Sequence, residues 1–130
     1  MRGETANRRR VVLVADDKKQ IRELLRDVLS DAGYAVLEAA DGRQAVRICR
    51  EATIDLVITD LVMPEQDGIE TIQALRLNFP SVPLIAMSGM FDIETILRTA
   101  RNLGAAAVFS KPLDVSEIVR TVAALLGDAS

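Results

Sequence analysis

The chain has 130 residues, the length of one ordinary domain, and 49% of them are hydrophobic, which is enough for a core without disulfides or a structural metal. Its formal net charge of −3 argues against direct nucleic-acid binding, which needs a clustered basic face. The chain has no histidine and one cysteine, which excludes a histidine base, a histidine metal ligand and an internal disulfide. A single cysteine fits a cytoplasmic protein.

Residues 1–10 are polar and charged, and we expect them to form a frayed or disordered tail. The apolar run that follows, Val11 to Ala15, is only five residues long before it meets two aspartates. A secretory signal needs about 7–15 apolar residues and a membrane span about 18. We therefore expect neither a signal peptide nor a membrane partner.

Short apolar runs alternate with helical periodicities along the rest of the chain. The apolar runs predict five strands, at Val11–Ala15, Ala35–Ala40, Leu56–Thr59, Pro83–Ser88 and Ala106–Lys111. Apolar residues at helical spacing predict a helix after each strand, with inner faces from Ile21 to Leu29, Ala45 to Cys49, Ile69 to Leu75, Ile93 to Leu103 and Ile118 to Leu126. Capping boxes are expected at Asp41–Gln44 and Asp114–Glu117.

This alternation leaves no room for a second domain. Strands and helices of these lengths, strictly alternating, indicate an α/β fold with a parallel sheet and helices on both faces. Right-handed crossovers restrict the topology to a few doubly wound arrangements. We therefore predict one doubly wound (βα)5 domain over residues 11–127, a three-layer sandwich.

Four of the five predicted strands lead into polar or charged residues. Asp16 and Asp17 follow the first strand, Asp60 ends the third, Ser88 the fourth and Lys111 the fifth. Each has an ordinary reading as a helix cap, a turn residue or a surface lysine. In a doubly wound sheet, however, the carboxyl ends of the strands border one crevice. Their joint occurrence therefore predicts a shared site.

The residue types suggest phosphoryl chemistry. Three neighbouring carboxylates stay ionised only beside a cation, and a few oxygen ligands suit Mg²⁺, which also takes phosphate oxygens. Lys111 offers a positive charge and Ser88 a hydrogen-bond donor to a phosphoryl group. With Asp16 or Asp17 on the metal, Asp60 is available to attack phosphorus and form an acyl phosphate.

The combined motifs resemble the receiver domain of bacterial two-component response regulators, of the single-domain, chemotaxis-regulator-like type. The resemblance extends from Val11 to Leu126 and rests on Asp16-Asp17, Asp60, Met63-Pro64, Asp67-Gly68, Ser88-Gly89 and Lys111-Pro112. It implies a flavodoxin-like fold with a parallel five-stranded sheet in the order 2-1-3-4-5.

The resemblance also implies roles for single residues. Asp60 would be the phosphoacceptor, Ser88 the switch hydroxyl and Lys111 the conserved lysine, followed by a cis peptide bond to Pro112. The Mg²⁺ ligands would be Asp16, Asp17, Asp60 and the backbone carbonyl of Val62. The family often carries Tyr or Phe three residues before the lysine; here that residue is Val108, and strand alternation turns Phe109 to the opposite face.

On this resemblance the protein would be a switch, not an enzyme beyond self-phosphorylation from phosphodonors and self-dephosphorylation. It would take its phosphoryl group from a sensor histidine kinase or a histidine phosphotransfer protein. The signal would reach a downstream protein partner through the fourth predicted helix, the fifth strand and the fifth helix. It would act alone or as a receiver fragment of a larger regulator or hybrid kinase.

Two alternatives come from other classes. An Asp-dependent phosphatase of the haloacid dehalogenase type carries Asp-x-Asp at the end of its first strand, a spacing that Asp16-Asp17-Lys18 lacks. A flavin-binding module needs a phosphate loop rich in Ser, Thr and Gly after that strand, where two aspartates would repel phosphate.

Overall fold

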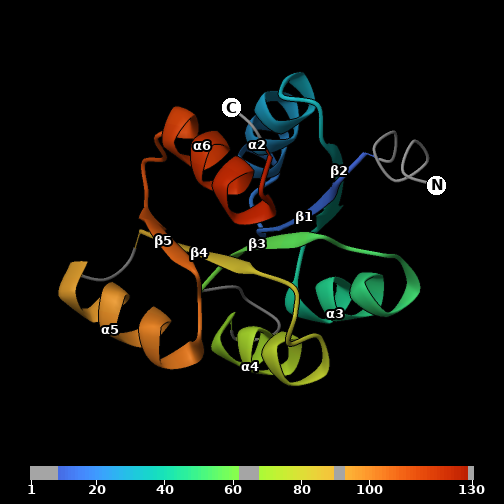
Figure 1. The fold of residues 1–130 in the computed structure, drawn as a ribbon. Helices are drawn as coiled ribbons and strands as arrows, with labels where there is room; N and C mark the ends of the chain where they lie inside the picture. Colours follow the sequence, from blue (N-terminus) through green and yellow to red (C-terminus); the bar gives the residue numbers. More distant parts are fainter. Residues whose placement is uncertain (1–8, 62–67, 90–92, 129–130) are drawn as a thin grey trace.

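The computed structural model describes residues 9–61, 68–89 and 93–128, and Figure 1 shows its arrangement. Five parallel strands form one sheet in the order β2-β1-β3-β4-β5, as expected. The strands are β1 (Val11–Ala15), β2 (Ala35–Ala39), β3 (Leu56–Asp60), β4 (Leu84–Ser88) and β5 (Ala107–Ser110). The prediction is confirmed for each strand: β1 has the predicted bounds, and the ends of the other strands differ from prediction by at most one residue.

The helices form two layers around the sheet. They are α2 (Lys19–Asp31), α3 (Gly42–Glu51), α4 (Gly68–Asn78), α5 (Ile93–Leu103) and α6 (Val115–Leu126). Helices α2 and α6 cover one face of the sheet, and α3, α4 and α5 cover the other (Figure 1). The predicted three-layer α/β sandwich is confirmed. No helix in these described ranges is long and apolar enough to cross a membrane.

Strand alternation divides the aliphatic core between the two faces. In β3, Leu56 and Ile58 pack with Leu25 and Ile118 on the α2–α6 side. Val57 points the other way, into the cluster that contains residues of α3 and α4. The central strands β1, β3 and β4 are thus buried on both faces, which explains why the sequence shows continuous apolar runs there instead of alternation.

The helix caps form at the predicted residues, except that the reciprocal bond from Gln44 goes to the residue before the cap. The Asp41 side chain accepts a hydrogen bond from Gln44 N at 2.9 Å, while Gln44 Oε1 accepts from Ala40 N at 2.6 Å, one residue before the cap. Asp114 accepts from Glu117 N at 3.3 Å and so caps α6. Both caps satisfy backbone donors that a helix start would otherwise leave unpaired.

Residues near the two ends of the chain meet at Tyr34, just before β2. The Tyr34 hydroxyl donates to Asp128 Oδ2 at 2.9 Å, and the carbonyl oxygen of Tyr34 accepts from Arg9 Nη2 at 2.8 Å. Arg10 Nη2 lies 3.7 Å from Asp128 Oδ1. The sequence assigns Arg9 and Arg10 to the tail, yet both side chains contact the folded domain. Burial and the hydrogen bond to Asp128 raise the pKa of Tyr34 to about 12.

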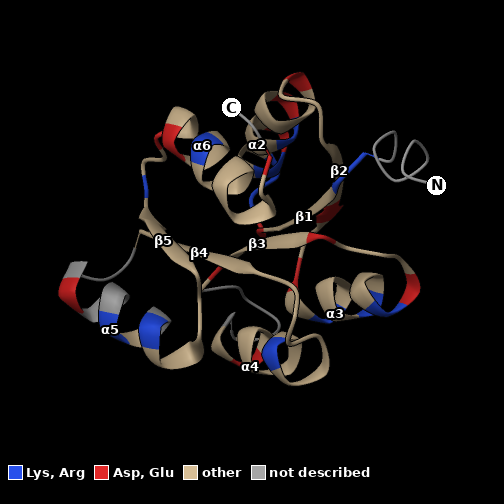
Figure 2. Ribbon diagram, viewed as in Figure 1, with Lys and Arg blue, Asp and Glu red and all other residues tan. Residues whose placement is uncertain are grey.

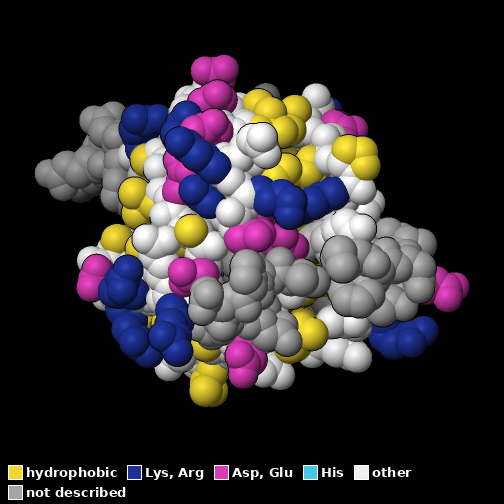
Figure 3. All heavy atoms as spheres, turned by 180° about the vertical axis from the view of Figure 1, so that it is seen from behind, with side chains coloured by type: hydrophobic (Ala, Val, Ile, Leu, Met, Phe, Trp, Pro, Cys, Tyr) yellow, Lys and Arg dark blue, Asp and Glu magenta, His cyan; other side chains and the backbone are white. Residues whose placement is uncertain are grey.

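Charged side chains lie mostly on the helices and at strand ends. Figure 2 shows β1, β3 and β4 without charge along their length, with charge appearing only where a strand ends. On the face turned toward the viewer in Figure 3, acidic and basic side chains lie next to one another. The interleaved signs on that face fit the small net charge of −3.

Candidate functional site

The register of the parallel sheet brings the predicted polar residues to its carboxyl edge. Asp60 is the last residue of β3 and is paired with Met87. Ser88, the last residue of β4, is paired with Ser110, so that Lys111 is the next residue beyond β5. Asp16 directly follows β1, and its amide donates to Ala39 O at 3.0 Å. The four strand ends predicted from the sequence therefore meet at one edge.

Three carboxylates gather at this edge. Asp16, Asp17 and Asp60 each offer a carboxylate oxygen, and these oxygens all lie within 4.8 Å of one another. Asp16 is fully buried and Asp60 is only 5% exposed, whereas Asp17 is exposed. Like charges at this spacing repel one another, and a cation between them offsets the repulsion. An oxygen-only donor set of this kind fits a hard divalent cation such as Mg²⁺.

Lys111 places an ammonium group between two of these carboxylates. Its Nζ lies 2.9 Å from Asp16 Oδ2 and 2.9 Å from Asp60 Oδ2. Burial lowers the pKa of Lys111, but hydrogen bonds and charges from Asp60 and Asp16 outweigh that effect and hold the pKa above its usual value. Lys111 is therefore a permanent positive charge at the centre of the cluster near neutral pH.

The backbone around Lys111 is shaped to let it reach the cluster. Its amide donates to Ser88 O at 3.0 Å, which continues the pairing of β4 with β5. A Cβ at Gly89 would lie 3.2 Å from Lys111 Cβ, so that only glycine leaves the lysine stem its present path without a shift. The Lys111–Pro112 peptide bond is cis, as the family resemblance implied.

Ser88 is fully buried at the end of β4, next to the strand that carries Asp60. Val62, expected to offer a backbone carbonyl to the metal, lies outside the described residues, as do Met63, Pro64 and Asp67.

The side chains of β5 alternate as the sequence predicts. Val108 packs against the cluster on the α3–α5 side, and Phe109 packs on the α2–α6 side. The position that often holds an aromatic residue in the family is therefore filled by a partly buried valine, and Phe109 faces the other layer.

Sequence reasoning missed Arg22, which lies on α2. Its Nη1 donates to the backbone carbonyl of Asp16 at 2.7 Å, and its Nε donates to Glu38 Oε1 at 3.1 Å. The available signal was Glu38, a charged residue inside the predicted second strand, since such a residue needs a cationic partner when it is only partly exposed.

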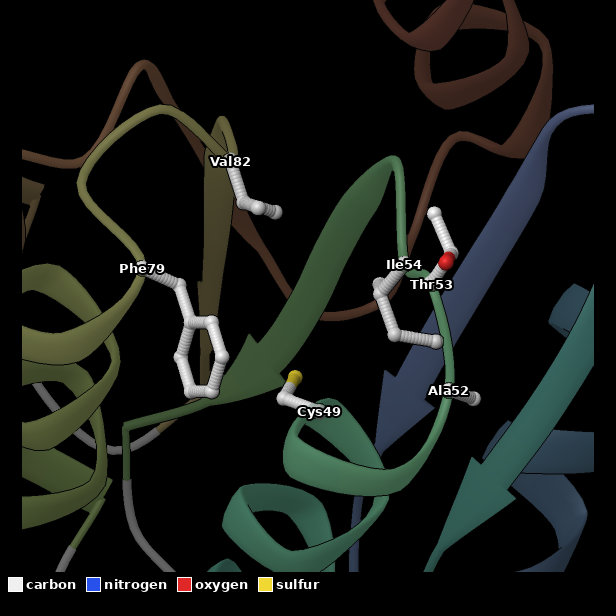
Figure 4. A pocket seen from close by; sticks show the side chains of 6 residues that line it. All are labelled: Cys49, Ala52, Thr53, Ile54, Phe79 and Val82. Atoms are coloured by element: carbon white, nitrogen blue, oxygen red, sulfur yellow. The ribbon is translucent and has the colours of Figure 1, made fainter.

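The amino edge of the sheet carries a different kind of cavity. A pocket of about 260 Å³ is lined by Cys49, Ala52, Thr53, Ile54, Phe79 and Val82. Figure 4 shows the Cys49 sulfur and the Phe79 ring bordering the same space. No lining residue is an acid or a basic amine, and burial raises the pKa of the Cys49 thiol to about 11. The pocket offers no group for transfer chemistry at neutral pH.

Comparison with known proteins agrees with the fold and the strand-end motifs. Residues 12–123 match the family model described as the response regulator receiver domain. The chain is 35% identical over 107 residues to sporulation initiation phosphotransferase F of Bacillus subtilis strain 168, which covers 82% of this chain and 86% of that protein.

A second relative is the transcriptional regulatory protein ZraR of Klebsiella oxytoca, 34% identical over 115 residues, or 88% of this chain and 26% of that protein. The chain thus spans most of the first relative and about a quarter of the second. The solved structure of chemotaxis protein CheY4 of Vibrio cholerae superposes with a TM-score of 0.83 at 30% identity, over 92% of this chain and 100% of that one. With this match of sequence, topology and motifs, the chain belongs to the response regulator receiver domain family.

Proposed function

We propose that this receiver domain is a phosphoacceptor switch in which Asp60 takes a phosphoryl group from a sensor histidine kinase or a histidine phosphotransfer protein. The observation that supports this proposal is that the Asp60 carboxylate lies next to two other carboxylates and an ammonium group at the carboxyl edge of the sheet. Its carboxylate lies within 4.8 Å of oxygens of Asp16 and Asp17, and 2.9 Å from the Lys111 ammonium. This cluster of side chains combines a nucleophile, a possible cation site and a fixed positive charge in one place.

Mg²⁺ is the proposed cofactor. Asp16, Asp17 and Asp60 would hold it, together with the Val62 carbonyl that family resemblance adds. The ion, when bound, neutralises the carboxylates and the oxygens of the incoming phosphoryl group. The donor set supports this assignment because all of its described atoms are carboxylate oxygens, which Mg²⁺ prefers.

The transfer forms one bond and breaks one. An Asp60 carboxylate oxygen bonds to phosphorus as the phosphorus–nitrogen bond of the donor phosphohistidine breaks, and the imidazole leaves with the bond's electron pair. Lys111, shared between Asp16 and Asp60, is close enough to pair with a phosphoryl oxygen as the negative charge shifts outward. The Ser88 hydroxyl donates to another phosphoryl oxygen.

The output surface is proposed to be formed by α5, β5 and α6, with a downstream protein as its partner. Lys111 links this surface to the acceptor, since it directly follows β5 and contacts Asp60. The B. subtilis relative is named as a phosphotransferase, which supports the part of the proposal that concerns phosphoryl transfer.

The phosphatase alternative would place the nucleophile at the end of the first strand, where Asp16 stands. Asp16 Oδ1 accepts from Lys18 N at 2.9 Å and Oδ2 accepts from Lys111 Nζ at 2.9 Å. The sequence Asp16-Asp17-Lys18 also lacks the Asp-x-Asp spacing of that class. The match to the receiver family favours Asp60 as the nucleophile.

The test is phosphorylation of the whole chain by acetyl phosphate, read by intact mass. We expect one added phosphoryl group that requires Mg²⁺ and is lost on treatment with hydroxylamine, which cleaves acyl phosphates. Wild-type protein that gains no phosphoryl mass with Mg²⁺ present would overturn the proposal, and a hydroxylamine-stable adduct would exclude the aspartyl assignment.

A further inference from the structure

Arg22 lies near the start of α2, where it contacts both the acidic loop and the edge strand β2. Nη1 donates to the Asp16 carbonyl at 2.7 Å, and Nε donates to Glu38 Oε1 at 3.1 Å. Its side chain is only 16% exposed, although arginine is usually found exposed. The planar guanidinium donates through two of its nitrogens to two different acceptors at fixed relative positions, which the single ammonium group of a lysine cannot do.

Glu38 serves a second arginine on the same helix. Its Oε2 accepts from Arg26 Nη1 at 3.1 Å, so that Arg22 and Arg26, four residues apart, share one carboxylate. The two arginines differ in their remaining contacts. Arg26 is 44% exposed and also bonds its neighbour Asp27, whereas Arg22 reaches the acidic loop.

The bond from Arg22 falls on the peptide that joins the two loop aspartates. The Asp16 carbonyl, its carbon and the Asp17 nitrogen lie in one plane, so holding the carbonyl fixes the direction in which Asp17 leaves that plane. Asp16 has further anchors, with its amide on Ala39 O at 3.0 Å and Oδ1 on Lys18 N at 2.9 Å. Asp17 is exposed, yet its carboxylate has an oxygen within 4.8 Å of oxygens of Asp16 and Asp60.

We propose that Arg22 is a positioning residue for the metal site: it holds the Asp16–Asp17 peptide so that the Asp17 carboxylate faces those of Asp16 and Asp60, and Glu38 holds Arg22 in turn. This inference rests on the proposed function and adds to it a residue that touches neither the metal nor the phosphoryl group. It assigns Glu38, a charged residue in an edge strand, to the support of the site.

A purely electrostatic role and a positioning role of Arg22 predict opposite changes in Mg²⁺ affinity when the residue is replaced. Arg22 carries a positive charge next to a cation site, so on charge alone its removal tightens Mg²⁺ binding. If Arg22 orients a ligand, its removal weakens Mg²⁺ binding, as loss of an outer hydrogen-bond partner commonly does. Arg26 is a matched control, because it has the same charge, the same helix and the same partner Glu38, but its hydrogen bonds do not reach Asp16.

The experiment is an NMR titration of the whole, unphosphorylated chain with Mg²⁺, for wild type, Arg22→Gln, Arg22→Lys and Arg26→Gln. We expect Arg22→Gln to raise the Mg²⁺ dissociation constant about tenfold, and Arg22→Lys to fall between it and wild type. Arg26→Gln should leave binding unchanged or slightly tighter. Unchanged or tighter binding in Arg22→Gln, or an equal loss in Arg26→Gln, overturns the inference.

A second reading comes from the metal-free protein. The carbonyl ¹³C resonance of Asp16 should move in Arg22→Gln and stay in place in Arg26→Gln, because only the first loses a donor to that oxygen. If Arg22→Gln does not fold, Arg22→Lys is used for both measurements, the Mg²⁺ dissociation constant and the carbonyl ¹³C resonance of Asp16. Wild-type protein that fails to bind Mg²⁺ would overturn the proposed function and this inference together. Normal wild-type binding with no effect of Arg22 overturns the inference alone.

Discussion

The two edges of the sheet are made by the same strands and carry opposite chemistry. At the carboxyl edge, Asp16 and Asp60 are buried around the Lys111 ammonium. At the amino edge, Ile54 and Phe79 line an apolar pocket of about 260 Å³. Burying like charges costs stability, while burying apolar side chains supplies it. The carboxyl edge therefore concentrates buried charge at some cost in stability, whereas the amino edge adds to stability by burying apolar side chains.

The largest expected effect separates activity from stability at the carboxyl edge. Asp60→Asn removes one of three crowded negative charges and the proposed acceptor, so phosphoryl uptake should fall to zero while the fold is kept. Thermal unfolding in the absence of metal should occur at an equal or higher temperature than in wild type. Intact mass after acetyl phosphate treatment gives the first reading and circular dichroism the second.

If Asp60→Asn still gains a hydroxylamine-sensitive phosphoryl mass, the acceptor is another carboxylate. A marked loss of thermal stability would instead show that the three-carboxylate repulsion is not a cost in the native state.

Lys111→Ala tests the cation of the same edge. It leaves the buried Asp16 and Asp60 without their ammonium, which should cost about 3 kcal/mol of unfolding free energy in metal-free buffer at neutral pH. Added Mg²⁺ should restore part of that loss by supplying the missing positive charge. Urea unfolding with and without Mg²⁺ measures both, and Lys18→Ala, which removes an exposed charge from the same region, is the control.

A Lys111→Ala protein as stable as wild type, with no response to Mg²⁺, would contradict the view that this lysine offsets the cluster.

The amino edge should show the reverse pattern. Ile54 is 7% exposed in the apolar pocket, and Ile54→Ala should lower the free energy of unfolding by about 2–4 kcal/mol. Phosphoryl uptake by the folded variant should match wild type. Ile54→Val, which removes one methylene, should cost about 1 kcal/mol and serves as the graded control. Reduced uptake in a fully folded Ile54→Ala would show that the two edges are coupled.

The smallest expected effect concerns pH at Tyr34. The pKa of Tyr34 is raised to about 12 in the folded state, against about 10 in an unfolded chain, so its contribution to stability is complete below pH 10 and is lost as pH rises toward 12. Tyr34→Phe should therefore reduce the fall in stability between pH 8 and pH 11, by about 1 kcal/mol. Urea unfolding at both pH values compares the two proteins, and an identical fall would refute the assignment.

Much of this architecture was predictable because it depends on local patterns. Continuous apolar runs marked the buried strands β1, β3 and β4, and residues that interrupt those runs marked the carboxyl edge. The proximity of Asp16, Asp60 and Lys111 depends on the strand order, which the family resemblance implied, and the structure places both lysine contacts at 2.9 Å. Their roles in phosphoryl transfer stay predictions.

Contacts between elements were not predictable in the same way. Arg22 and Glu38 are 16 residues apart, and nothing in helical or strand periodicity says that their side chains meet. The same holds for Tyr34 and Asp128, which are 94 residues apart. Such pairs depend on the exact position and rotation at which α2 and α6 pack on the sheet. The pattern of hydrophobic and polar residues does not determine that position.

The contacts at Tyr34 also have a consequence for chain connectivity. Since Arg9 and Asp128 both bond this one residue, side chains near the first and the last described residues are held by the same part of the domain. A circular permutant that joins the two ends by a short Gly/Ser linker and opens at the exposed Ala52–Thr53 turn should keep the same sheet order. In such a permutant, the residues of the acidic edge would change their order along the chain but keep the same neighbours in the folded domain.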